Sequence, residues 1–207
     1  MTNKGRMDSV ILKIEKKIKS FRRGRIFFAD DFISMGSSAN IRQSLLRISN
    51  AGVIIRVAKG IYCYPEIDTK LGLGVIYPSF DQIANAMAER VHARIVPTGE
   101  YALNTLGLST QVPMNYVYYT DGQSRSVTVI GGKTITFKNT SPRNLAFTNK
   151  LSMLVTSALK AIKQKNVTPE QIAHISELLR KEDKDAVLKD LALMPVWIRQ
   201  IVKQAYE

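Results

Sequence analysis

The chain has 207 residues, 45% of them hydrophobic and 23% charged, so it can bury a sizeable core, which excludes wholesale disorder. Its formal net charge of +13 favours a polyanionic partner, which leaves nucleic acid, an anionic membrane or an acidic protein. One cysteine, Cys63, excludes an internal disulfide framework. The charged N-terminus and the lack of an apolar run near ~18 residues indicate neither a signal peptide nor a membrane span, so we expect a cytoplasmic protein.

The positive charge is concentrated at the N-terminal end. Residues 1–66 contain thirteen basic and five acidic residues, a net charge of +8, whereas the remaining two thirds of the chain carry only the other +5. This skew favours the N-terminal part as the part that binds a polyanion.

The first 35 residues predict two helices and a short strand. Met7 to Ser20 is amphipathic, because Ile11, Ile14 and Ile18 recur at helical spacing. A basic turn follows at 21–25, a strand at 26–28 and a short helix at 29–33. Met35-Gly36 predicts a turn between helices, where glycine tolerates a positive φ.

The segment from Gly36 to Pro65 predicts a helix followed by a basic hairpin. Ser37 or Ser38 is a suitable N-cap, and Ile41, Leu45 and Ile48 define the buried stripe. After a reversal at 51–52, residues 53–57 and 61–64 suit two strands around a turn at 58–60. The element order is that of a winged helix-turn-helix, so we predict such a DNA-binding domain over residues 1–66.

The candidate DNA-binding residues follow from this arrangement. The polar face of the helix would enter a major groove while the hairpin and the preceding basic turn reach phosphates. Taken alone, these basic side chains are also typical of a solvated helix face. The residues expected to meet base edges are Ser38, Asn40, Gln43 and Arg47, and those expected to neutralise phosphates are Arg42, Arg56, Lys59, Arg22, Arg23 and Arg25.

Residues 67–207 predict a second, α+β domain, so the whole chain is assigned to the α+β class. The glycine-rich stretch 66–77 is interpreted as a packed connector whose apolar residues need cover. Helices are expected at 78–91 and 99–106, with a strand at 94–97. Three alternating segments, 116–120, 126–130 and 134–138, predict a small antiparallel sheet, a three-stranded meander turning at Asp121-Gly122 and Gly131-Gly132. A C-terminal helical part from about 149 to 207 is predicted from helices at 149–165, 168–181, 183–190 and 195–205.

The sequence contains no convincing catalytic or metal-binding constellation. His92 and His174 have no partner at ligand spacing. The strand pattern of metal-dependent nucleases fails, because Thr136 stands where a second acid would have to accompany Asp121. We therefore expect no enzyme activity, no cofactor and no metal.

A group of tyrosines and basic residues leaves two interpretations open. The side chains are either half-buried residues of the sheet, or a patch that stacks bases or binds an acidic protein. The group consists of Tyr116, Tyr118, Tyr119, Arg125, Lys133, Lys138 and Arg143.

The hairpin segment carries the pattern Gly-x3-Arg-x3-Gly-x-Tyr-x2-Pro, formed by Gly52, Arg56, Gly60, Tyr62 and Pro65. With this pattern and the segment IVPTGEYALNTLGLSTQVP at 95–113, nearly the whole chain resembles AbiEi-type antitoxins of type IV toxin–antitoxin systems. The resemblance implies a cytoplasmic DNA-binding antitoxin whose winged helix binds inverted repeats in its own promoter and represses the operon. Its later domain would counter a nucleotidyltransferase toxin, in some systems without stable contact.

Two functional hypotheses follow. The first is a DNA-binding transcriptional repressor and antitoxin, acting on duplex DNA either as a homodimer or as two monomers on an inverted repeat. The second is a protein-interaction module that uses a winged-helix scaffold to bind an acidic partner.

Overall fold

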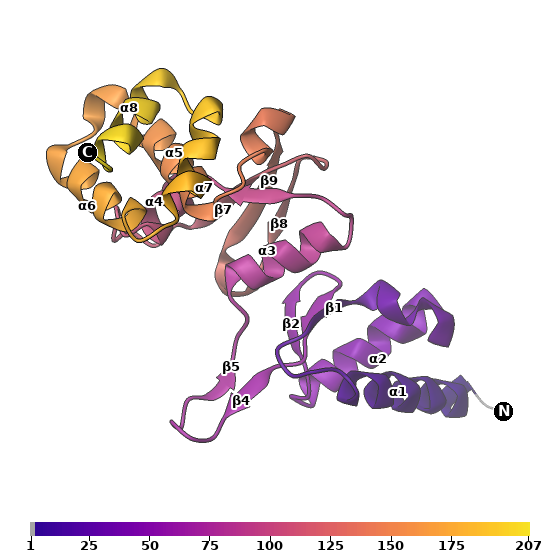
Figure 1. Ribbon diagram of the computed structural model, residues 1–207. Helices are drawn as coiled ribbons and strands as arrows, with labels where there is room; N and C mark the ends of the chain where they lie inside the picture. The colour runs from indigo at the N-terminus through magenta and orange to yellow at the C-terminus, as the bar shows by residue number, and fades with distance from the viewer. Residues whose placement is uncertain (1–2) are drawn as a thin grey trace. The chain divides into compact units, whose positions relative to one another are not determined.

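The computed structural model describes residues 3–207, with side chains from Ser9 onward. The chain is α+β, with helices and three small sheets in the described part (Figure 1). It divides into two compact units, the first formed by residues up to Met87 with Thr128–Gly132, the second by Ala88–Val127 with Lys133–Glu207. No helix in the described range is long and apolar enough to cross a membrane.

The first unit begins with helices that pack on a three-stranded sheet. Its core contains the fully buried side chains of Ile14, Ile18, Phe27, Phe32 and Leu45, which confirms the apolar stripes expected from helical spacing. The elements are α1 (Asn3–Lys19), β1 (Ile26–Phe28), the 3-10 helix η1 (Ala29–Met35), α2 (Ser38–Asn50), β2 (Ile55–Ala58), β3 (Ile61–Cys63), β4 (Glu66–Asp68) and β5 (Gly74–Ile76); helix α3 (Phe80–Glu89) contains the division between the units.

The three-stranded sheet is antiparallel in the order β1-β3-β2. Tyr62 on the central strand faces Phe27 on one side and Arg56 on the other. The rings of Phe27 and Tyr62 stack at 5.9 Å, which fixes the sheet on the helical core. Val129, from the segment 128–132, extends this edge by an isolated antiparallel bridge to Ala58.

Gly36 has a different role from the one predicted. Its φ of 169° is extended backbone that any residue adopts, so the expected positive φ is wrong. A Cβ at this position would lie 3.2 Å from Cγ2 of Val10 on α1. The close approach of α1 to the turn before α2 explains the glycine.

The stretch from 66 to 77 is a hairpin of β4 and β5, and not the packed connector expected from its apolar residues. Gly72 and Gly74 adopt φ values of 72° and 69° at the reversal. A two-stranded sheet has no further strand or helix layer of its own to cover both faces. The side chains expected to be covered are therefore exposed, Leu71 by 79%, together with Leu73, Val75 and Ile76.

The second unit combines a mixed four-stranded sheet with a helical cluster. The sheet order is β6-β7-β9-β8, with β6 and β7 antiparallel and β7 and β9 parallel. The elements are β6 (Ile95–Pro97), α4 (Glu100–Thr105), β7 (Asn115–Thr120), β8 (Arg125–Thr128), η2 (Ile130–Gly132, which belongs to the first unit), β9 (Thr134–Asn139), η3 (Pro142–Leu145), α5 (Lys150–Ile162), η4 (Gln164–Asn166), α6 (Pro169–Leu179), α7 (Lys184–Lys189), η5 (Asp190–Leu193) and α8 (Val196–Gln204).

The predicted three-stranded meander is therefore wrong, because β9 lies between β7 and β8. The usual two-residue hairpins need a positive φ at the first turn residue or at both, and neither Asp121 nor Gly122 has one. The Asp121 carboxylate instead accepts hydrogen bonds from the backbone N–H and the Nε of Arg94, both at 2.8 Å. Gly122 is required by space, since its Cβ would lie 3.1 Å from that of Ala93.

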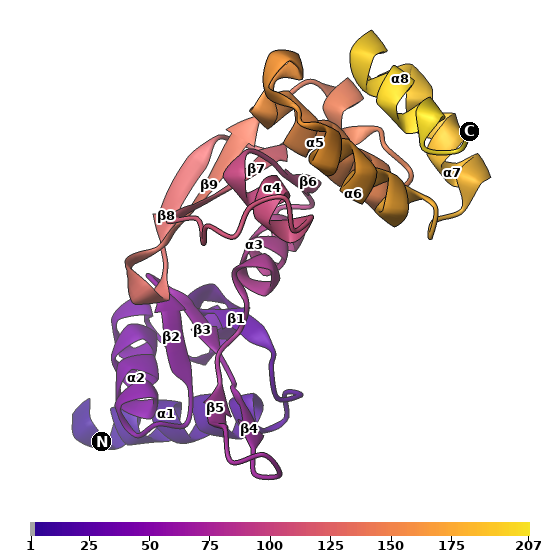
Figure 2. The ribbon, with the colours of Figure 1, turned by 90° about the vertical axis from the view of Figure 1, so that its left-hand side faces the viewer.

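The C-terminal helices α5 and α6 begin at side-chain caps. Asn149 caps α5, and Thr168 forms a capping box with Gln171 at the start of α6. The helices α4 to α8 surround one apolar core that includes Val155, Leu159 and Ile198 (Figure 2).

Candidate nucleic-acid interface

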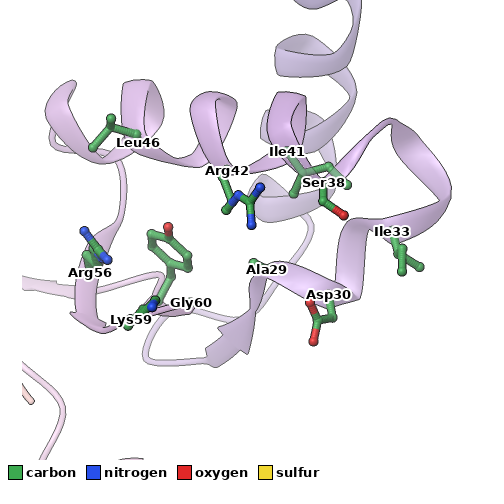
Figure 3. Close-up of a pocket in the computed structure, with 11 residues that line it drawn as sticks. Ala29, Asp30, Ile33, Ser38, Ile41, Arg42, Leu46, Arg56, Lys59 and Gly60 are labelled. Atoms are coloured by element: carbon green, nitrogen blue, oxygen red, sulfur yellow. The ribbon is translucent and has the colours of Figure 1, made fainter. Parts of the chain in front are cut away.

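A cleft of about 530 Å³ lies between α2 and the β2–β3 hairpin of the first unit (Figure 3). Helix α2 forms one wall, the hairpin forms the opposite wall, and η1 closes one side. The lining residues are Ala29, Asp30, Ile33, Ser38, Ile41, Arg42, Leu46, Arg56, Lys59, Gly60 and Tyr62.

The helical wall is positioned by the cap and the buried stripe of α2. The Ser37 hydroxyl accepts the backbone N–H of Asn40 at 3.3 Å, which sets where the helix begins. Ile41, Leu45 and Ile48 face the core. Ser38, Arg42 and Leu46 also line the cleft, and because they follow one another at four-residue spacing they form one row along α2.

The opposite wall is positioned by the hairpin. Gly60 has a φ of 75°, which allows the tight reversal that presents Lys59. Arg56 is exposed and paired in register with Tyr62, whose side chain also lines the cleft. Burial raises the pKa of the Tyr62 phenol, and the nearby Arg56 charge only opposes this shift, so the phenol is neutral at pH 7 and can donate a hydrogen bond.

Three cations surround this cleft, and their side chains have no partner among the described residues. The side chains of Arg42, Arg56 and Lys59 form no hydrogen bond or ion pair with any group that the structure describes. Figure 3 shows Arg42 on the helical wall, and Arg56 and Lys59 on the hairpin wall. Like charges around one concave surface create a positive potential that an anion would relieve. The Asp30 carboxylate on η1 is the one acidic lining group.

The other residues predicted on α2 do not line the cleft. Gln43 and Arg47 are exposed one turn apart on the helix, and Asn40 is half-buried near its start. The predicted base-reading group is thus divided, with Ser38 in the cleft and these three residues outside it.

The basic turn before β1 lies away from the cleft. Arg25 accepts the N–H of Tyr64 at one end of the β1–β3 ladder, whereas Gly60 accepts the N–H of Ala29 at the other end. Its side chains are also partly engaged: Arg23 donates to the Pro65 carbonyl at 3.0 Å, and the Arg25 guanidinium lies over the Phe21 ring. The structure therefore does not bring Arg22, Arg23 and Arg25 together with the cleft cations.

Sequence reasoning missed the apolar part of the cleft. Leu46 and Ile33 line it and are 47% and 69% exposed. Leu46 follows Arg42 by one helical turn and does not belong to the buried stripe, so its spacing was the signal that could have identified it.

The tyrosine and histidine side chains that were candidates for a functional site in the second unit make contacts inside that unit. Tyr116 and Tyr118 are buried, and Tyr118 stacks on Phe137 at 5.9 Å, so these rings belong to the core and form no surface patch. His174 is half-buried, with Nε2 2.8 Å from the Leu106 carbonyl.

Burial raises the pKa of the Cys63 thiol in the first unit to about 11. Among the described residues, no group of three His, Cys, Asp or Glu side chains is arranged to hold a metal ion.

Comparison with known proteins places the chain in a family. The model of DUF6088, a family of unknown function, matches residues 13–187. The chain belongs to this family. No curated protein matches this DUF6088 chain. Among solved structures, it is similar to the crystal structure of the RV2827C protein from Mycobacterium tuberculosis, with a TM-score of 0.49, 11% sequence identity, and coverage of 97% of this chain and 76% of that chain.

Proposed function

We propose that this chain is a sequence-specific DNA-binding regulator and that its first unit is a winged helix-turn-helix. The observation that carries the proposal is the set of three cations around one cleft, Arg42, Arg56 and Lys59, whose side chains have no partner in the part of the chain that the structure describes. Duplex DNA supplies the regular row of phosphates that such a set complements. The excess of positive charge in residues 1–66 supports the same assignment.

In this proposal, α2 enters the major groove and one DNA backbone runs along the rim of the cleft between helix and hairpin. Arg42 on the helical wall, with Arg56 and Lys59 on the hairpin wall, contact phosphates from both sides, and the neutral Tyr62 phenol donates a further hydrogen bond. Gln43 and Arg47, on the exposed part of α2, meet base edges.

The proposal extends to an antitoxin that represses its own operon and counters a nucleotidyltransferase toxin. This part is supported by the resemblance to AbiEi-type antitoxins, which includes three cleft residues, Arg56, Gly60 and Tyr62, in its pattern. Co-expression with a nucleotidyltransferase encoded beside this gene tests it: growth should be restored by the full chain, and a toxin whose effect is unchanged would refute it.

The DNA-binding part is tested by fluorescence anisotropy with two duplexes of equal length, the region upstream of the gene and a shuffled version. We expect tighter binding to the upstream duplex, with an affinity that falls as salt rises from ~50 to ~200 mM. Equal affinity for both duplexes would refute promoter recognition. An absence of salt-dependent binding would favour the alternative, a module for an acidic protein partner.

A further inference from the structure

Leu46 occupies an unusual place on α2. The helix buries Ile41, Ser44, Leu45 and Ile48. Leu46 comes two residues before Ile48, so it points ~200° round the helix from that buried side chain. It is 47% exposed on the outward face, where the predicted reading residues are polar.

The surroundings of Leu46 make this apolar group part of the candidate interface. It lines the same cleft as Arg42, Arg56 and Lys59, and Ile33 of η1 adds a second exposed apolar side chain there. Figure 3 shows Leu46 on the same helical wall as Arg42. An occupant must therefore present negative charge to the rim and an apolar group to the helix.

Duplex DNA meets both requirements in one groove. Its phosphates complement the three cations, and the C5-methyl of thymine is the apolar group that the major groove exposes. An acidic protein would offer carboxylates at less regular spacing than the phosphates of a backbone. The charge around the cleft therefore favours DNA as the occupant.

We propose that Leu46 determines specificity by packing on the C5-methyl of thymine in the bound site. The inference rests on the proposed DNA-binding function and names thymine as one base that the protein selects. Gln43, three residues before Leu46 and therefore on a neighbouring part of the helix surface, reads an adjacent base edge.

The test compares thymine with uracil, which pairs identically but lacks the methyl group. Duplexes are selected by the full-length protein from a random library, then resynthesised with deoxyuridine at each thymidine in turn. At the contacted position the wild-type protein should lose about fourfold in affinity, the value of one buried methyl group. Leu46→Ala should bind the two duplexes equally.

Leu12→Ala is the matched control, because Leu12 is 67% exposed on α1 and does not line the cleft. This variant should discriminate between thymine and uracil as the wild type does. Melting temperatures of both variants check that they are folded.

The outcomes separate this inference from the function on which it rests. If no duplex is enriched, DNA binding itself fails and the inference falls with it. If duplexes are enriched but uracil is tolerated at every position, or if Leu46→Ala still discriminates, DNA binding stands and the role of Leu46 is refuted. Capture of a defined acidic peptide in the cleft instead of DNA would also overturn it.

Discussion

The two units of the chain use their basic side chains differently. In the second unit, Arg94 pairs with Asp121 at 2.8 Å, Arg143 donates to the Ala192 carbonyl, and Arg199 donates to two carbonyls near the start of α8. In the first unit, Arg42 and Lys59 have no such partner among the described residues. These arginines of the second unit therefore stabilise its fold, whereas the cations at the cleft of the first unit leave charge for an external ligand.

The cavities of the two units differ in the same way. The second unit has a cavity of about 400 Å³ lined by Val91, Thr120 and Phe137, close in size to the 530 Å³ cleft. Its lining cation, Arg125, lies 5.2 Å from the centre of the Phe137 ring. Size alone does not distinguish these two hollows, whereas the presence of cations without internal partners does.

The largest expected effect comes from removing the three cleft cations together. The variant Arg42→Ala/Arg56→Ala/Lys59→Ala should lose about 100-fold in affinity for duplex DNA, because three charge-assisted phosphate contacts disappear. The slope of log affinity against log salt should fall by about 2.7. Anisotropy titrations at several salt concentrations measure both quantities.

The matched variant removes basic side chains that the second unit uses internally. Arg143→Ala/Arg199→Ala should leave duplex affinity unchanged and lower the melting temperature, since backbone carbonyls lose their donors. The proposed difference between the basic side chains of the two units is contradicted if this variant weakens DNA binding as much as the cleft variant does, or if the cleft variant is the less stable of the two.

The next largest effect is expected from removing a buried carboxylate, and it concerns stability alone. Asp190 is 2% exposed and accepts hydrogen bonds from the backbone N–H of Thr148, the Thr148 hydroxyl and the N–H of Asn149, at 2.8–3.1 Å. Asp190→Ala leaves these donors unsatisfied and should lower the free energy of unfolding in urea by about 2 kcal/mol. Asp185→Ala, at an exposed position on α7, is the control, and an equal loss there would contradict this account.

Local signals predicted much of the fold. Local sequence patterns correctly gave α2, α5 and α6, with a cap predicted for α2, because such patterns act within one or two helical turns. The order of the second sheet was not predictable in this way. It depends on β7 pairing with β9, Asn115 opposite Thr134, and a local sequence pattern does not report which strands pair.

The candidate site was also predictable only in part. Arg42, Arg56 and Lys59 were identified from charge and element order, and the structure brings them around one cleft. The sequence did not show that Arg23 and Arg25 contact aromatic rings at the other end of the β1–β3 ladder. The spacing of Leu46 outside the buried stripe places it on the outward face of α2, but the sequence did not show that the hairpin cations Arg56 and Lys59 lie across the cleft from it.

A smaller effect concerns acid stability in the second unit. The side-chain hydrogen bond from Arg94 lowers the pKa of Asp121 in the folded protein. A depressed folded pKa stabilises the protein above the unfolded value, about 3.9, and this stability is lost as pH falls through the lowered folded pKa. Asp121→Asn should therefore reduce the melting temperature at pH 7 and match the wild type at the lowest pH. Arg94→Gln should give the same profile, with no further loss in the double variant.

The smallest effect comes from one buried hydroxyl in each unit. Ser44 on α2 and Ser152 on α5 are fully buried, and neither Oγ has a hydrogen-bond partner among the described residues. Alanine removes an unsatisfied polar group and favours the helix, so Ser44→Ala and Ser152→Ala should each leave stability unchanged or raise it by up to about 1 kcal/mol. Ser44 faces the core behind the outward face of α2, so Ser44→Ala should also keep wild-type affinity for duplex DNA. A loss of affinity with unchanged stability would show that binding depends on the buried side of α2, and would place part of the recognition outside the cleft.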